Sequence, residues 1–165
     1  MDYTKANKLI QYNLWANSLL MQWVIAAGNA AADTEVKSSF NTLRNTIYHI
    51  YDAQYVWFLR VQNQPLLHWP PSSNFNYTLA QFDIVLQQQS NDWLQFIATL
   101  KPNEFEQTIV YTNTKNQPFE TTIADIITHW INHGTYHRGQ CITMLHQLGF
   151  NAVGSTDYIT FCRLK

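Results

Sequence analysis

The strongest constraint on the fold is that four long segments repeat apolar residues at spacings of three and four. The segments are residues 3–27, 39–62, 79–100 and 122–148. Such spacing places the apolar side chains on one face of an α-helix. Four amphipathic helices bury these faces most simply against one another, so the sequence predicts an all-α, four-helix bundle. A helical domain of another topology is the alternative, because the pattern gives the number of helices better than their order.

Capping residues mark the ends of the predicted helices. Ser38 or Ser39 can cap the second helix and Thr78 the third, because a hydroxyl oxygen there accepts from free N–H groups of the first turn. Gly28 follows the first helix and Gly149 follows the fourth, at positions where glycine commonly ends a helix.

The segments between the helices are not helical in pattern. Residues 62–77 hold three prolines and no apolar period, which predicts a long surface loop. Residues 105–121 are rich in β-branched and aromatic residues around a turn-like stretch at 113–116, and they predict a small β-hairpin or a pair of extended arms. The tail, 151–165, has β character in DYITFC and is expected to pack along the bundle. No repeat or second domain is visible, so 1–165 is expected to be one domain.

Composition argues against nucleic-acid and membrane partners. The 165 residues carry a formal net charge of −1 and no run of Lys or Arg, whereas a nucleic-acid binder normally shows a basic patch. Polar residues interrupt the N-terminal segment, so it resembles neither a signal peptide nor a membrane span. Cys141 and Cys162 form no spacing motif. Two free thiols predict a reducing cytoplasm, and a single disulfide between them is the alternative.

Three histidines follow one another at i, i+4 and i+8 in the last predicted helix: His129, His133 and His137. Residues i and i+4 lie about 6 Å apart along the axis and share a face, whereas i and i+8 lie about 12 Å apart. One adjacent pair is therefore expected to share a metal ion. By the helical period, His137 lies about 40° from the apolar centre, His133 about 80° and His129 about 120°. This favours His133 and His137.

A third ligand should come from another helix. His49 is the only histidine of the second predicted helix, whereas His68 falls in the proline-rich loop and His146 falls late in the fourth helix. His49 is thus favoured as the third metal ligand. The competing interpretation is that these histidines are packed or hydrogen-bonded side chains without a metal. HExxH, CxxC and helical Glu-x-x-His motifs, which mark other metal sites, are absent from the sequence.

The sequence resembles the DinB/YfiT-like superfamily in three places. These are HGTYHRGQ at 133–140, TLRNTIYHIYDAQYVWFLR at 42–60 and YNLWANSLL at 12–20. The resemblance covers nearly the whole chain. It implies a bundle in up-down-down-up order, often a homodimer, with metal ligands that map to His49, His133 and His137. Some relatives are transferases or isomerases that use small thiols. The family name does not imply DNA binding.

Residues around the motif have several interpretations. Asp52, one turn from His49, is a candidate hydrogen-bond acceptor for a ligand histidine and a candidate general base, unless it is an ordinary exposed acid. Cys141 is either a fourth ligand or a small buried hydrophobe. His129 is expected to support a ligand or contact the neighbouring helix. Arg138 and Gln140 are expected to order the helix or a dimer contact. Gly139 is expected to permit the close approach of another helix.

Three neutral histidines leave metal coordination positions open, which is typical of catalytic sites. We expect a divalent ion, zinc or nickel, although imidazole ligands also suit copper and iron. The predicted function is a metal-dependent thiol S-transferase or hydrolase with a small-molecule thiol substrate. The alternatives are a metal-binding or stress-response protein without catalysis, and a dimeric structural module stabilised by metal. Loading should weaken below about pH 6.5, where free histidine protonates.

Overall fold

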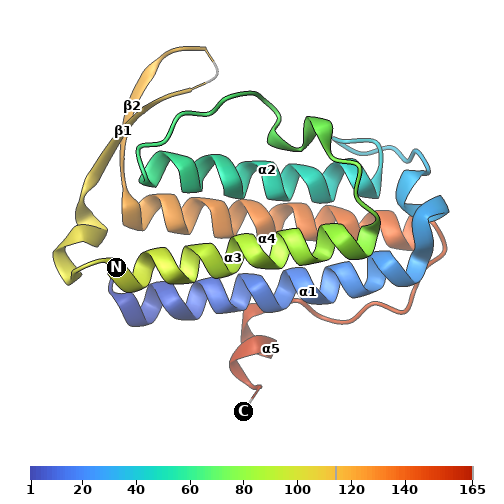
Figure 1. The fold of residues 1–165 in the computed structure, drawn as a ribbon. Coiled ribbons are helices and arrows are strands. Elements are labelled where there is room, and N and C mark those ends of the chain that lie inside the picture. Colours follow the sequence, from blue (N-terminus) through green and yellow to red (C-terminus); the bar gives the residue numbers. More distant parts are fainter. Residues whose placement is uncertain (114, 165) are drawn as a thin grey trace.

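Four long helices make up most of the structure, a computed structural model that describes residues 1–113 and 115–164. They are α1 (Tyr3–Asp33), α2 (Leu43–Val61), α3 (Leu79–Thr99) and α4 (Ile123–Gln147). In Figure 1, α1 and α4 run in one direction along the bundle, and α2 and α3 run in the other. The all-α bundle and its up-down-down-up order are therefore confirmed.

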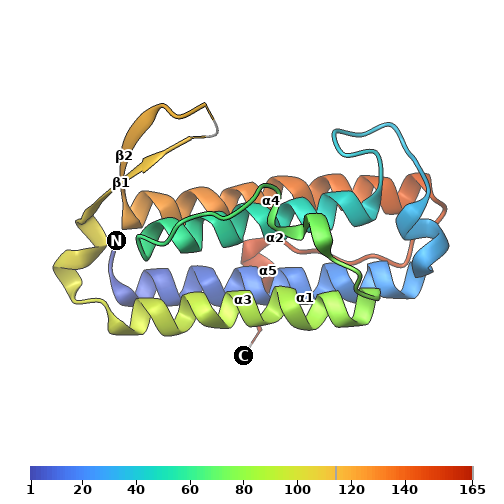
Figure 2. The ribbon, with the colours of Figure 1, turned by 45° about the horizontal axis from the view of Figure 1, so that its top comes forward.

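The helices form two layers. Figure 2 shows α2 beside α4 in one layer and α1 beside α3 in the other. The most extensive helix contacts are those of α1 with α3 and of α2 with α4. Because α2 and α3 run in the same direction, the chain between them must return along the whole bundle. The predicted proline-rich loop makes this crossover and includes the short 3₁₀ helix η1 (Pro71–Asn74).

Side-chain caps begin the helices, although not always at the predicted residue. Thr78 caps α3 as predicted, in a capping box with Gln81. The cap of α2 is Thr42, so the prediction of Ser38 or Ser39 was wrong. The physical reason is a turn: Val36 N donates to the carbonyl oxygen of Asn41 (2.7 Å), and Asn41 has a positive φ of 61°. A right-handed helix can begin only after this turn.

The first helix extends beyond its predicted end. Gly28 breaks the helical conformation as expected, with φ 88° and ψ 167°, a region open mainly to glycine. The chain then re-enters a helix and continues to Asp33. Arg44 of α2 contacts the carboxylate of Asp33, with Nη2 donating to Oδ2 at 3.0 Å. The kink thus returns the chain toward α2 rather than ending the helical segment.

The predicted hairpin, rather than a pair of unpaired extended arms, precedes α4 (Ile123–Gln147). After the 3₁₀ helix η2 (Pro102–Glu106), strands β1 (Thr108–Thr112) and β2 (Pro118–Thr122) pair antiparallel. The predicted turn at 113–116 includes residue 114, which lies outside the described residues, as does residue 165 of the tail.

The DYITFC segment of the tail forms α5 (Tyr158–Cys162), so its predicted β character was wrong. Tyr158 and Phe161 are spaced by three, which suits a helix, and both rings contact Tyr12 of α1. Tertiary contact with α1 therefore outweighs the local β propensity of this short segment.

A layer of polar side chains crosses the core between two apolar clusters. Arg138 of α4 is fully buried, and its Nη1 donates to Asn13 Oδ1 (2.7 Å) and Asn17 Oδ1 (2.9 Å) of α1. Asn13 in turn donates to Gln54 of α2, and Gln54 donates to Ser90 of α3 (3.1 Å). One hydrogen-bonded chain therefore connects all four long helices, and it fixes their relative positions more specifically than apolar contact alone.

None of the helices in the described part of the chain combines the length and the apolar character that a bilayer span requires.

The two glycines of the motif in α4 have different surroundings. A Cβ on Gly134 would lie 3.0 Å from Arg138 Nη1 and 3.0 Å from Asn13 Oδ1, the two atoms of a buried hydrogen bond. A Cβ on Gly139 would meet nothing within 4 Å. The close approach of α1 to α4 therefore occurs at Gly134. The prediction that Gly139 permits a close helix approach was wrong.

We expect Gly134→Ala to destabilise the protein by about 1–3 kcal/mol, because the methyl group forces apart a packed, hydrogen-bonded pair. Gly139→Ala is the matched control on the same helix and should stabilise by about 0.5–1 kcal/mol through helix propensity. Urea unfolding followed by circular dichroism measures both. Equal effects of the two substitutions would contradict the close approach at Gly134.

Candidate metal centre

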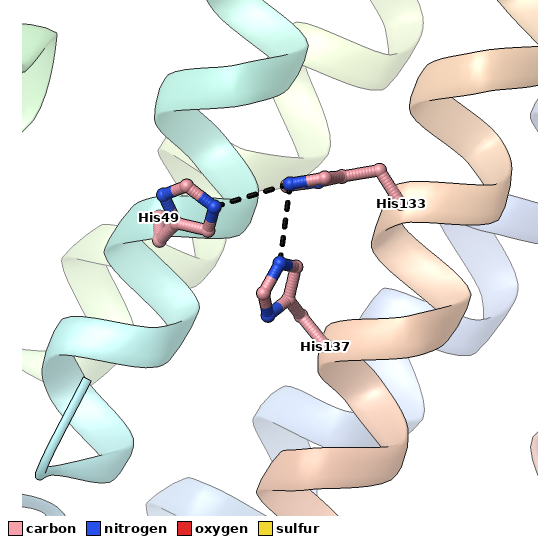
Figure 3. Close-up of side chains that lie close together, drawn as sticks. All are labelled: His49, His133 and His137. Atoms are coloured by element: carbon pink, nitrogen blue, oxygen red, sulfur yellow. Dashed lines mark hydrogen bonds between the residues drawn. The ribbon is translucent and has the colours of Figure 1, made fainter. Parts of the chain in front are cut away.

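Three imidazole rings converge between α2 and α4. His133 Nε2 lies 3.1 Å from His49 Nε2 and 3.1 Å from His137 Nε2. One ring nitrogen from each residue falls within a group whose atoms all lie within 4.8 Å of one another. Figure 3 shows the His49 ring reaching across from α2 to the two rings of α4. The structure thus brings together the three predicted residues.

The helical period explains this convergence. His133 and His137 lie one turn apart on α4, and His49 lies opposite them because α2 and α4 pack side by side. His137 is only 6% exposed, His133 is half-buried, and His129 is exposed. This order of depth is the one that the period predicted. His129 stands outside the group, and its ring packs edge-on against Trp57 of α2 at 5.1 Å.

A hydrogen bond outside the group fixes which nitrogen of His137 faces the other rings with a lone pair. His137 Nδ1 donates to Gln140 Oε1 at 2.7 Å, so His137 Nε2 carries a lone pair. The Gln140 amide is held in turn by its Nε2, which donates to Ser39 Oγ at 3.3 Å. With the same tautomer on the other two rings, three lone pairs point at one another. A bound cation stabilises that arrangement, whereas the other tautomer of His133 donates its Nε2–H to one neighbouring ring instead.

Burial keeps the three rings neutral. It lowers the pKa of His49 to about 4, with a further contribution from the charge of His137. It lowers the pKa of His133 to about 3, with contributions from His137, His49 and His129. Burial also lowers the pKa of His137, opposed by its hydrogen bond to Gln140. Neutral imidazole is the form that binds a metal, so the donors are ready near neutral pH.

The donor set fits a divalent metal ion. Metal–nitrogen bonds of about 2.0–2.1 Å allow two nitrogens 3.1 Å apart to reach the same ion. Three imidazoles suit borderline ions such as zinc and nickel. Cys141 is fully buried in the apolar cluster of one end of the bundle and is not part of the group. The interpretation of Cys141 as a small hydrophobe is therefore the one that the structure supports.

Aromatic side chains pack against two of the three rings, His49 and His137. Phe40, from the connection between α1 and α2, stacks on His49 at 4.1 Å and meets His137 edge-on at 5.5 Å. Tyr136 meets His137 edge-on at 4.9 Å. These rings restrict the orientation of the imidazoles and displace water beside them.

Asp52 is buried, and its hydrogen-bond partner is a loop residue rather than a candidate ligand. It is 3% exposed, so its interpretation as an exposed acid was wrong. Its hydrogen bonds go to the crossover loop: Ser72 N donates to Oδ1 (2.7 Å) and Ser72 Oγ donates to Oδ2 (2.8 Å). Burial raises the pKa of Asp52, and the bonds from Ser72 oppose this shift. The acceptor for a candidate ligand is Gln140 on His137, which the sequence analysis did not assign to this role.

A pocket of about 430 Å³ lies beside the centre. His49, Asp52 and Tyr48 of α2 form part of its wall, together with aromatic side chains from both connecting loops: Phe40, Trp69 and Phe75. The volume suits part of a small molecule. Asp52 holds Ser72, and thereby holds the loop that closes this pocket.

A helical bundle with three converging histidines on two adjacent helices belongs to the class of candidate metal-binding bundles. The chain is a member of the DinB family, whose sequence model matches residues 2–164. It is similar to Protein DinB of Bacillus subtilis (strain 168), with 26% identity over 166 residues that cover 93% of this chain and 91% of that protein.

We expect Gln140→Leu to weaken metal affinity about 10–100-fold, because the outer hydrogen bond of His137 fixes its tautomer and orientation. Gln147→Leu, two turns later on the exposed surface of α4, is the matched control and should leave the affinity unchanged. Competition against a chromophoric chelator measures both affinities. Equal affinities for the two variants would show that Gln140 does not position the ligand.

Metal loading should persist to lower pH than free histidine allows. Protons compete with the metal for the imidazole nitrogens. Because the pKa values of His49 and His133 are depressed to about 4 and about 3, competition begins well below the ordinary value of about 6.5. We expect occupancy to be retained at about pH 5 and lost as the pH approaches about 4. Metal analysis after dialysis across this range is the test, and half-loss near pH 6.5 would contradict it.

Proposed function

We propose that His49, His133 and His137 bind one divalent metal ion, zinc or nickel, and that the protein is a metal-dependent thiol S-transferase or hydrolase. The observation that supports this most strongly is the convergence of three neutral Nε2 atoms beside a pocket. Three protein ligands leave coordination positions for a substrate or water, as in catalytic sites. A bound divalent ion supplies Lewis-acid chemistry that lowers the pKa of water or a thiol.

The aromatic wall of the pocket orients the small-molecule substrate. Phe40 and Trp69 come from different loops and present apolar surface on the same pocket as His49. Such surface excludes water and holds the non-reacting part of a ligand by apolar burial. The reacting group then lies nearest the histidines.

Asp52 is the acid–base candidate of this site. Its carboxylate is buried, and the raised pKa favours a group that takes up a proton. Ser72 Oγ donates to Asp52 Oδ2, so a proton released by a ligand beside Ser72 can pass through this hydroxyl to the carboxylate. We propose this path, together with the anchoring of the loop, as the role of Asp52.

Non-catalytic metal binding, in a stress response or in a dimeric structural module, is the competing function. We also propose that residues 1–165 form one domain and that two copies associate. The supporting observation is apolar exposure around α5, where Ile159 and Leu164 are each 56% exposed.

The function predicts a thiol-dependent spectral change at the metal. Adding 2-mercaptoethanol to cobalt-loaded protein should produce a sulfur-to-cobalt absorption band, and a chromogenic aryl halide should then be consumed with the thiol. Asp52→Asn, which keeps the side-chain size, should leave the band and slow the turnover. A band without turnover would favour a metal-binding protein that is not an enzyme.

Metal should stabilise the bundle without being required for it to fold, because the two apolar clusters are extensive. Chelation should lower the melting temperature and leave helical circular dichroism largely unchanged. His133→Ala with His137→Ala should abolish binding and still give a helical protein. Sedimentation of the same samples tests the homodimer. Unfolding on chelation would make the site structural and remove the argument for catalysis.

A further inference from the structure

Arg60, in the last turn of α2, packs against two aromatic rings that also contact each other edge-on, with ring centres 5.0 Å apart. Its guanidinium carbon is 4.3 Å from the ring centre of Trp57 and 4.5 Å from that of Tyr111 on β1. Its Nη2 donates to the carbonyl oxygen of Thr112 at 3.2 Å. The contacts with the two rings and this hydrogen bond restrict the orientation of the guanidinium. A cation fixed in this way is preorganised for recognition.

The charge of Arg60 has no acidic partner among the described residues. The ion pairs within them join Asp33 to Arg44 and the N-terminal amine to Glu106. A guanidinium carries five N–H donors in a planar fork, and one acceptor is found for Arg60 in the described part of the chain. Arg60 is half-buried, so its charge is less well solvated than on an open surface. An anion is the partner that would stabilise it.

A pocket of about 380 Å³ opens beside Arg60, with walls from the end of α2, the loop that follows it and the hairpin. Part of its wall is apolar, from Val56, Leu59 and Val110. The other part carries amide side chains that can donate hydrogen bonds to oxygen: Asn63, Gln64, Asn113 and Asn116. One cation, several amides and a limited apolar wall suit the oxyanion end of a small molecule rather than a protein surface.

Successive ring contacts connect Arg60 with the histidines. The ring of His133 lies 6.0 Å from that of His129, which lies 5.1 Å from that of Trp57, on which Arg60 stacks. Arg60 follows His49 by eleven residues on the same helix, a rise of about 16 Å. An extended molecule of roughly that length can contact both places.

We propose that Arg60 binds the carboxylate or phosphate of an extended small molecule whose other end lies at the three histidines. The inference rests on the proposed function, because it names a second contact for the substrate of that site. A purely structural role, in which Arg60 ties the hairpin to α2, uses its contacts with the two rings and one N–H. The open edge of the guanidinium and the amide-lined pocket fit ligand recognition better.

Wild-type, cobalt-loaded protein tests the proposal with ω-mercapto-carboxylic acids of graded length and the matching ω-mercapto-alcohols. The cobalt–sulfur band reports the affinity of each thiol. Beyond a threshold length, we expect the carboxylate to bind about tenfold or more tightly than the alcohol, as for a hydrogen bond to a charged group. ω-Mercaptoalkyl phosphates of the same lengths distinguish the two anions. Equal affinity of acid, phosphate and alcohol at every length would overturn the proposal.

Arg60→Met should abolish this advantage and leave the alcohol affinity and metal content unchanged. Arg44→Met is the matched control: it removes one positive charge from the same helix, on the other side of His49, and should preserve the advantage. If both variants lost the tighter binding of the carboxylate, the preference would come from the net charge of the protein rather than from Arg60. That result would overturn the proposed anion site.

Metal-free protein gives a separate measurement. Acetate and inorganic phosphate should shift the NMR signal of the Arg60 Nε–H group, assigned by its loss in Arg60→Lys. No shift would overturn the anion site. A shift without any cobalt–sulfur band, for any thiol, would instead refute the proposed thiol chemistry and leave the anion site standing.

Discussion

The buried charge of Arg138 is the interaction on which the arrangement of the bundle depends. Its guanidinium lies fully inside the core and contacts neutral oxygens of α1, with no carboxylate among its described hydrogen-bond partners. A buried cation is unfavourable unless these bonds have good geometry, so the rotation of α4 is tightly restricted. His137 and His133 lie about 100° and 140° round the helix from Arg138 in the same sense. Directing Arg138 at α1 therefore directs both rings toward α2.

The sequence predicted the parts of the site that depend on the helical period. The choice of His133 over His129, and the greater depth of His137, follow from angles around one helix, and the structure has the same order. The hydrogen bond from His137 to Gln140 joins positions i and i+3, so helix spacing contained this information although Asp52 was preferred. The bond from Ser72 to Asp52 joins a helix to a distant loop, and no periodic signal precedes such a contact.

The errors at Gly139 and in the tail have a common physical origin. Each feature was assigned from local preference, whereas a contact distant in sequence decides it. Gly134 rather than Gly139 is crowded because Arg138 and Asn13 meet beside it. The tail is helical because its aromatic rings pack on α1. Single-sequence patterns describe faces of helices well and describe the choice among partners poorly.

The long crossover between α2 and α3 separates two tasks within the molecule. The histidines stand on helices that the polar layer holds rigidly, while Trp69 and Phe75 of the neighbouring pocket belong to the crossover loop. Loops tolerate substitution and insertion far better than packed helices. Descendants of such a chain can therefore acquire a new shape of pocket by altering one connection, with the histidine centre inherited intact. A scaffold built in this way is suited to diversify its ligands over evolutionary time.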